Sequence, residues 1–446
     1  MTYSPLYMDG LVGPTHHFGG LSFGNRASMS SRRVESSPKK AALQGLAKMK
    51  LVMDMGVKQA FVIPHARPDL KFLHDCGFKG DKKTVLGDAY KASPSLLASA
   101  FSSSFMWAAN MGVISSSAVT GDGKVHITPA NLAATVHRHI EPEFSSTLLN
   151  MMFPDSKYFT HHKPVYKCFS DEGAANMITL LSDDKSVAMT VFVYGRSESS
   201  PLIEYPKFYP ARQTKEAIDV IIRNHQLDSQ NVMIIQQSPQ AIDAGVFHND
   251  VISFGANNIL ICHDNAFVNQ EALLPELLDR YYKATHEELC IIQLSDDCLS
   301  LDDVVESYLF NSQLVEKPDG SLWLLLPQKC KEFEEAAAFC EHLVNDSKVI
   351  SGFDYVALDQ SMKNGGGPAC LRQQLYLNEK EHAAFDQRFI LTPKKYALLT
   401  DWVNTTYRDE VSAEDFQDDA FVNDAFKSLD ELTQLLDLGS VYFFQK

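Results

Sequence analysis

Four glycine-bearing loops hold most of the side chains in this sequence that could do chemistry. They are residues 9–28 (DGLVGPTHHFGGLSFGNRAS), 171–176 (DEGAAN), 245–250 (GVFHND) and 364–370 (NGGGPAC). In the last loop, three glycines leave backbone amides unobstructed, and Pro368 stiffens the approach to Cys370. A thiol beside a bound ligand can attack as thiolate when a nearby cation lowers its pKa. Cys370 is therefore a candidate nucleophile, although most cysteines are simply small buried apolar residues.

The loop at residues 245–250 supplies a candidate proton carrier and a candidate cation anchor. His248 and Asp250 lie two residues apart, so on a strand both side chains would share one face. A histidine can move protons at neutral pH, and a carboxylate can hold a cation. On this motif alone, a surface histidine in a polar loop is an equally good interpretation. In DEGAAN, the acidic pair Asp171 and Glu172 indicates the N-terminus of a helix.

Nucleotide and metal sites are not predicted. The segment GGLSFGN is not a G-x-G-x-x-G loop after a strand, and the chain has no GK[ST] sequence. The neighbouring pairs His16-His17, His161-His162 and Cys262-His263 direct their side chains apart, and HExxH does not occur. We therefore expect no metal and no cofactor.

Composition and charge narrow the class of protein. The chain has 446 residues, with 40 Lys and Arg against 56 Asp and Glu, a formal charge of −16. No basic stripe of the kind that binds nucleic acid is present. The N-terminus lacks the pattern of a signal peptide, and no apolar run approaches the roughly 18 residues of a membrane span. Eight scattered cysteines without a CxxC pair indicate reduced thiols, so we expect a cytoplasmic protein without membrane or nucleic-acid partners.

Strand and helix patterns alternate along the chain and predict an α/β fold. Short apolar runs predict buried strands at 61–63, 191–194, 232–235, 259–262 and 322–326. Periodic segments predict helices at 38–55, 214–224, 271–283, 331–344, 395–407 and 425–438. Because no Pro-, Gly- or Ser-rich linker divides the chain, we expect one domain spanning residues 1–446.

Several motifs together resemble one family. In chain order they include DGLVGPTHHFGGLSFGN, SSSFMWAANMG, DGKVHITPANL, DEGAAN, FVYGR, YPARQT, GVFHNDV, YLFNSQL, NGGGPACLR and LLDLGSVYFFQ. They resemble the N-succinylarginine dihydrolases of the guanidine-modifying (pentein) superfamily, over almost the whole chain. The resemblance implies a five-bladed α/β propeller, in which ββαβ-type modules surround a pseudo-fivefold axis with the active site at its centre. It also implies a homo-oligomer, which we expect to be a dimer.

The resemblance assigns roles to individual residues. It implies Cys370 as nucleophile, His248 as general acid and base, Glu172 as the carboxylate that assists them, and Asp250 as the anchor of the guanidinium. Asn110 occupies a position at which related deiminases often have a carboxylate. The implied substrate contacts are Gly19, Gly20, Leu21, Ser22, Phe23, Gly24, Asn25, Arg26, Ala27, Ser28, Asn110, His137, Arg138, Arg212, Asp250 and Asn364.

The implied reaction belongs to arginine catabolism. It converts N2-succinylarginine and water into N2-succinylornithine, two ammonia and carbon dioxide. An arginine deiminase or an amidinotransferase of the same fold would release one ammonia or none. A non-catalytic binding protein of this fold is a further alternative, against which the joint presence of Cys370, His248 and Glu172 argues.

Overall fold

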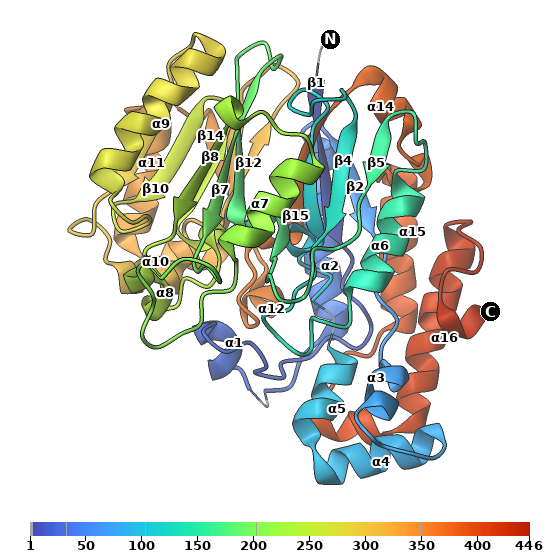
Figure 1. Cartoon of the computed structure of the whole chain (residues 1–446). Helices are drawn as coiled ribbons and strands as arrows, with labels where there is room; N and C mark the ends of the chain where they lie inside the picture. Colours follow the sequence, from blue (N-terminus) through green and yellow to red (C-terminus); the bar gives the residue numbers. More distant parts are fainter. Residues whose placement is uncertain (1–2, 33, 103, 202, 348) are drawn as a thin grey trace.

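Five three-stranded sheets form the frame of the molecule in a computed structural model (Figure 1), which describes residues 3–446 except 33, 103, 202 and 348. In every sheet the middle strand pairs antiparallel with one neighbour and parallel with the other. In spatial order the sheets are β15 (Arg372–Asn378), β1 (Tyr3–Gly10), β2 (Lys58–Val62); β3 (Gly112–Ser115), β4 (Val125–Pro129), β5 (Phe159–His161); β6 (Met177–Leu181), β7 (Ala188–Tyr194), β8 (Val232–Gln236); β9 (Ser253–Ala256), β10 (Ile259–His263), β11 (Cys290–Leu294); and β12 (Gln313–Glu316), β13 (Leu322–Pro327), β14 (Gly352–Val356).

In each sheet, the crossover from the middle strand to its parallel neighbour contains a helix of at least ten residues, as parallel pairing requires a long connection. These helices are α2 (Pro38–Asp54), α6 (Pro142–Met152), α7 (Lys215–Asn224), α9 (Gln270–Thr285) and α11 (Glu334–Asn345). The predicted ββαβ module is therefore confirmed in all five sheets. Because β15 pairs with β1, from Tyr3 opposite Asn378 to Asp9 opposite Arg372, two strands far apart in the sequence share one sheet.

Local sequence explains these helices. In α2, the Ser37 side chain accepts a hydrogen bond from the backbone N–H of Lys40, and Pro38 occupies the first turn, where a missing N–H costs nothing. Leu46 and Met49 are fully buried on one face of this helix. In α7, Thr214 is the cap, and Ile218 and Ile221 join an apolar cluster with both parallel strands of their sheet. Apolar burial of this kind supplies most of a helix's stability in a protein.

The predicted strands and helices are all present, with shifted ends. Helix α16 (Asp419–Leu435) begins six residues before the predicted start because Asp418 caps it, and α11 begins three residues late because residues Gln328–Glu332 form a 3-10 turn. His248 and Asp250 do not lie on a strand, so the shared face that a strand would give them does not apply: a 3-10 turn, η4 (Asn249–Val251), follows His248 directly. Glu172 likewise precedes a 3-10 turn, η2 (Gly173–Asn176).

A helical lobe beside the ring was not predicted. It contains α3 (Leu70–Asp75), α4 (Lys82–Ala92) and α5 (Pro94–Phe101), which lie against α16 at the bottom of Figure 1. Their apolar side chains form one cluster with Phe416, Phe421 and Val422 from the C-terminal region. The remaining α-helices are α1 (Arg26–Ser30), α8 (Pro239–Ala244), α10 (Leu301–Ser307), α12 (Asp359–Met362), α13 (Pro368–Leu371), α14 (Glu379–Ala384) and α15 (Pro393–Thr406).

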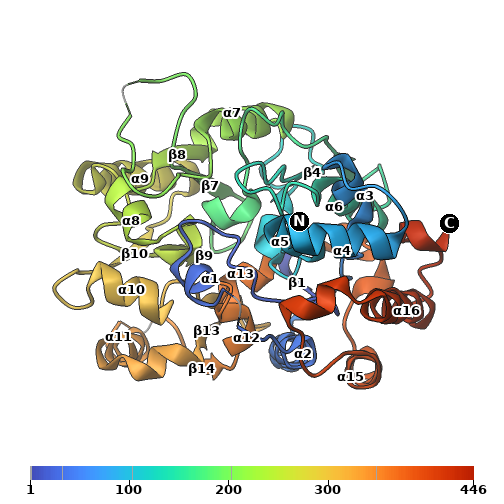
Figure 2. The ribbon, with the colours of Figure 1, turned by 90° about the horizontal axis from the view of Figure 1, so that it is seen from below.

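The view from below places α13, which carries Cys370, near the centre of the ring, with α1 beside it (Figure 2). Within the described residues, no helix combines the length and apolar character needed to cross a membrane.

Candidate functional site

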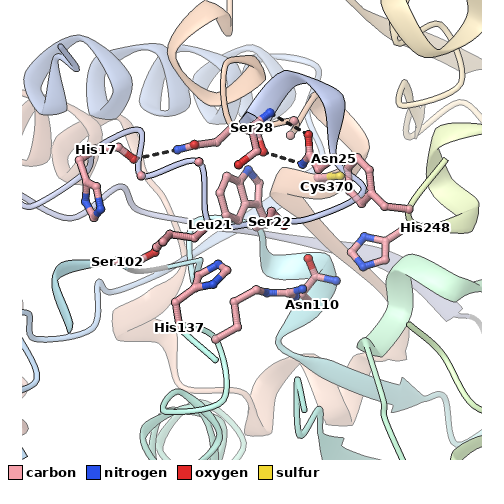
Figure 3. A pocket seen from close by; sticks show the side chains of 18 of the residues that line it. His17, Leu21, Ser22, Asn25, Ser28, Ser102, Asn110, His137, His248 and Cys370 are labelled. Atoms are coloured by element: carbon pink, nitrogen blue, oxygen red, sulfur yellow. Dashed lines mark hydrogen bonds between the residues drawn. The ribbon is translucent and has the colours of Figure 1, made fainter. Parts of the chain in front are cut away.

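One pocket gathers residues from nearly all the loops singled out in the sequence (Figure 3). Thirteen of the predicted residues line it: Gly19, Gly20, Leu21, Ser22, Asn25, Ser28, Asn110, His137, Arg138, Arg212, His248, Asn364 and Cys370. Seven further lining residues were not predicted: His16, His17, Ser102, Trp107, Phe247, Gly365 and Gly366. Most of these seven neighbour a predicted residue in the same motif, so the motifs located the pocket better than the individual assignments did.

Glu172 lies behind the pocket wall and connects two of its residues. This fully buried carboxylate accepts hydrogen bonds at Oε2 from Arg138 Nη1 (2.5 Å) and from His248 Nε2 (2.7 Å). Burial opposes its ionisation, but the Arg138 guanidinium and the His248 hydrogen bond outweigh burial and hold the Glu172 pKa well below its usual range. Asn110 Nδ2 donates to the backbone carbonyl of Glu172 (2.7 Å) and so fixes its position.

Glu172 determines which nitrogen of His248 carries the proton. An ionised carboxylate can only accept hydrogen bonds, so the His248 Nε2 facing it must carry a hydrogen. Burial lowers the His248 pKa to about 4, against the raising effect of Glu172, so the ring is neutral near pH 7. His248 Nδ1 then holds a lone pair, and it has no hydrogen-bond partner among the described residues. A neutral imidazole with a free lone pair is a general base.

Cys370 lies on the short helix α13, whose first residue is Pro368. Its Sγ is 3.2 Å from Asp250 Oδ2 and 3.0 Å from Asn311 Nδ2, and the side chain is buried. Burial and the Asp250 carboxylate raise the Cys370 pKa well above its ordinary value. Without a bound cation, this pKa is therefore raised, and its lowering by a substrate cation stays a prediction. The sulfur is a neutral thiol whose hydrogen is donated to Asp250.

Asp250 is a half-buried carboxylate whose Oδ1 is shielded from solvent, and the protein compensates its charge little. One oxygen contacts the thiol, and the other, Oδ1, has no hydrogen-bond partner among the described residues. Burial raises the Asp250 pKa to about 6, although the thiol contact and the positive charge of Arg372 oppose that rise. Near pH 7 the group is ionised, and a bound cation would stabilise it strongly.

Cations and polar groups also line the pocket. Arg212 Nη2 donates to Ser22 Oγ and to the carbonyl of Phe23, both at 3.1 Å, and its guanidinium lies 4.9 Å from the centre of the Phe247 ring. Burial lowers the Arg212 pKa to about 10, so this group stays protonated near neutral pH. Arg138 Nη2 has no hydrogen-bond partner among the described residues. This region can therefore bind an anion.

Glycines let two loops meet over the pocket. Asn25 Nδ2 donates to the carbonyl of Asn364 (2.8 Å), and Asn364 Nδ2 donates to the carbonyl of His17 (3.0 Å). A Cβ at Gly365 would lie 2.1 Å from Asn25 Nδ2, and the φ of +89° also favours glycine there. The NGGG sequence is therefore required by this close contact.

Four residues of the predicted substrate-binding stretch do not line the pocket: Phe23, Gly24, Arg26 and Ala27. The Phe23 side chain is 58% exposed and packs edge-on against Tyr209. Arg26 instead forms ion pairs with Asp302 (2.7 Å) and Glu306 (3.4 Å). Conversely, the sequence interpretation missed Asn311, which contacts the sulfur directly; the only signal for it was its presence in the motif YLFNSQL.

A metal site finds no support in the described part of the chain. There, no three His, Cys, Asp or Glu side chains are grouped so that they could hold an ion.

Comparison with known proteins gives a consistent result. The family model described as succinylarginine dihydrolase (AstB) matches residues 4–445. N-succinylarginine dihydrolases of Photobacterium profundum and Pseudoalteromonas translucida are 45% and 44% identical to this chain, and each alignment covers 98% of both sequences.

Solved structures extend the likeness to the fold. The N-terminal domain of the cyanobacterial arginine dihydrolase ArgZ, bound to product, superposes with a TM-score of 0.51 at 12% identity, covering 83% of this chain and 97% of that one. The apo structure of ArgZ gives a TM-score of 0.50 at 13% identity, covering 83% of this chain and 40% of that one. At such identity the likeness concerns the fold alone, and it confirms the predicted five-bladed α/β architecture.

Proposed function

Because the chain belongs to the succinylarginine dihydrolase family, we propose that it converts N2-succinylarginine and two waters into N2-succinylornithine, two ammonia and carbon dioxide. The observation that carries this proposal is that Cys370 and His248 line one pocket, while Asp250, which does not line it, contacts Cys370 Sγ and Glu172 is hydrogen-bonded to His248. These groups provide a nucleophile, a cation anchor, a base and the carboxylate that orients the base.

The substrate guanidinium binds to Asp250. Its N–H groups supply the hydrogen bonds that Oδ1 lacks, and its charge compensates the carboxylate. The same cation lies beside Sγ, where it favours thiolate over thiol and offsets the effects of burial and of Asp250. Substrate binding thus activates the nucleophile, which stays protonated in the free protein.

The first round replaces one nitrogen by oxygen. His248 Nδ1 accepts the thiol proton while Sγ attacks the guanidinium carbon, giving a tetrahedral adduct. His248 returns that proton to a terminal nitrogen, the C–N bond breaks, and ammonia leaves behind an amidino-thioether. His248 then takes a proton from water, the resulting hydroxide adds to the carbon, and the C–S bond breaks to give a ureido group and free Cys370.

The second round acts on the ureido carbon by the same steps. Sγ attacks, the remaining terminal nitrogen leaves as ammonia, and a thiocarbamate forms. Water cleaves it to a carbamate, which loses carbon dioxide and frees the amine of succinylornithine. Two waters are consumed and two ammonia are released in all.

The succinyl and α-carboxylate groups bind at the cationic part of the pocket. Arg212 is protonated and faces Ser22, and Arg138 retains an unpartnered Nη2 among the described residues. The neutral histidines His16, His17 and His137 add hydrogen-bonding groups without a charge, because burial lowers the pKa of each. Action as a homodimer stays a prediction from the resemblance, and a cytoplasmic location stays a prediction from the cysteine pattern.

Ammonia release from N2-succinylarginine and from arginine, measured side by side, tests the function. We expect two ammonia per succinylarginine and a much lower rate with arginine. One ammonia would indicate a deiminase, and equal rates with both substrates would contradict the specificity. The variant Cys370→Ser should lose turnover while still binding succinylarginine in calorimetry, because the serine hydroxyl is a far weaker nucleophile.

A further inference from the structure

Asn311 connects the nucleophile to its anchor. It lies between α10 and β12, and its side chain is fully buried. Its Oδ1 accepts hydrogen bonds from the backbone N–H groups of Gly367 (2.8 Å) and Cys370 (3.3 Å). Its Nδ2 donates to the carbonyl of Asp250 (3.1 Å) and to Cys370 Sγ (3.0 Å). One side chain thus contacts the backbone of both reactive residues and the sulfur itself.

These partners fix the orientation of the amide. The two backbone N–H groups can only donate, so they must face the oxygen of Asn311, and the carbonyl of Asp250 can only accept, so it must face the nitrogen. A flipped amide would place its NH2 group against the N–H groups of Gly367 and Cys370, and its oxygen against the carbonyl of Asp250. The group that faces Sγ is therefore an N–H donor.

We propose that Asn311 is a catalytic residue, whose Nδ2 donates a hydrogen bond to the Cys370 sulfur and stabilises the thiolate as it forms. The inference rests on the proposed role of Cys370 as nucleophile. The other side chain in contact with the sulfur is Asp250, whose negative charge disfavours thiolate. An N–H donor is stronger toward a charged acceptor than toward a neutral thiol, so the bond strengthens during proton loss.

The glycine loop is shaped for this contact. A Cβ at Gly367 would lie 2.8 Å from Asn311 Oδ1 and 3.0 Å from its backbone oxygen. The Asn311 carbonyl also accepts from the N–H of Ala369 (3.1 Å). The start of α13 thus packs directly on Asn311, which sets the distance between Nδ2 and Sγ.

Asn311→Asp removes the N–H donor that faces the sulfur and keeps an oxygen that accepts from the backbone. The carboxylate keeps an oxygen for Gly367 and Cys370 but places a second oxygen, in place of N–H, toward the sulfur. The measurement is the rate of Cys370 alkylation by iodoacetamide as a function of pH, resolved by peptide mass spectrometry because the chain has exposed cysteines as well. We expect the rate at pH 8 to fall about 10- to 100-fold, the effect of losing a hydrogen bond to a charged group.

A matched control exists in Asn131→Asp. Asn131 is also buried, accepts at Oδ1 from the N–H groups of Ala133 (3.1 Å) and Asp171 (3.0 Å), and donates to the carbonyl of Phe169 (2.6 Å). It makes the same kinds of backbone contact without touching sulfur, so the alkylation profile of Cys370 should stay that of the wild type.

Asn311→Ser provides a second variant if the aspartate variant does not fold. This substitution removes the amide without adding a charge. It should slow the alkylation of Cys370 at least about tenfold. It should also lower kcat by a larger factor than it raises KM. Wild-type alkylation profiles in both Asn311 variants would overturn the proposal. Alkylation requires no turnover, so a protein that fails to hydrolyse succinylarginine while keeping the predicted profiles would contradict only the proposed function.

Discussion

The two carboxylates of the site, the fully buried Glu172 and the half-buried Asp250, differ in what the protein provides for each. Glu172 has a guanidinium and an imidazole on one oxygen, and its pKa lies well below the usual range. Asp250 has only a thiol on Oδ2, and burial raises its pKa to about 6. The second oxygen of each carboxylate has no hydrogen-bond partner in the described chain, so the difference between them is the cationic partner that Glu172 has and Asp250 lacks. The protein thus compensates the first charge itself and leaves the second for a cation from outside.

This difference separates two uses of a buried charge. A compensated carboxylate holds its neighbours in place, as Glu172 holds His248 in one tautomer. An uncompensated carboxylate lowers the stability of the folded protein, and that cost is recovered when a cationic substrate binds beside it. Part of the substrate's binding energy therefore comes from a charge that folding leaves without a partner. Substitution of each carboxylate by its amide should therefore have opposite effects on stability, although both reduce activity.

Asp250→Asn should have the largest effect on activity. Loss of one partner from a desolvated charge pair costs about 2–5 kcal/mol, so kcat/KM for succinylarginine should fall about 30- to 5,000-fold. The measurement is steady-state ammonia release. A loss below tenfold would show that Asp250 does not hold the guanidinium.

The same variant should gain stability at alkaline pH. Because folding raises the Asp250 pKa from about 4 to about 6, the stability contributed by its protonated form is complete below pH 4 and is lost as pH rises through 6. Asparagine has no charge to lose, so Asp250→Asn should exceed the wild type in the free energy of unfolding by up to about 3 kcal/mol at pH 8. Urea unfolding at pH 8 and pH 4 should show this gain disappear at the lower pH.

Glu172→Gln should lose both activity and stability. The amide leaves the buried Arg138 without its ion-pair partner, and breaking such a pair costs about 3–5 kcal/mol. Because the Glu172 pKa is lowered on folding, its contribution is present above pH 4 and is lost as pH falls. The deficit in unfolding free energy should therefore shrink in acid, as the gain of the Asp250 variant does, but the two effects have opposite signs.

Loss of the tautomer control on His248 should reduce kcat by about a hundredfold in Glu172→Gln, within the range for general acid-base catalysis. Equal stability changes in the two amide variants would contradict the comparison on which both predictions depend.

The sequence specified the chemical groups better than the contacts between them. Motifs of several residues identified Cys370, His248, Glu172 and Asp250, and alternating apolar and periodic segments predicted the α/β class. The sequence could not show that Asp250 lacks compensation, because that depends on which side chains from distant loops approach it. A single asparagine such as Asn311 carries no pattern, and the lobe of α3, α4 and α5 becomes stable by packing on residues more than 300 positions away.

Two arginines, Arg212 and Arg26, can be compared in the same way as the two carboxylates. Arg212 is buried and lines the pocket. Arg212→Ala should therefore raise the KM for succinylarginine about 10- to 100-fold. It should also reduce the preference of the enzyme for succinylarginine over arginine. Arg212→Lys is the matched control, because it keeps the charge but loses the planar fork and should recover part of the affinity. An unchanged ratio of kcat/KM between the two substrates in Arg212→Ala would exclude a role in recognising the succinyl end.

Arg26→Ala should have the smallest effect. The Arg26 side chain is 38% exposed, and its partners Asp302 and Glu306 are 77% and 53% exposed, so solvent screens both ion pairs. We expect a loss of at most about 1 kcal/mol in unfolding free energy, declining as salt is added. Activity should stay within about twofold, since Arg26 does not line the pocket. Asp302→Ala should reproduce both results. A KM raised tenfold in Arg26→Ala but not in Asp302→Ala would show that Arg26 contacts the substrate, as the resemblance implies.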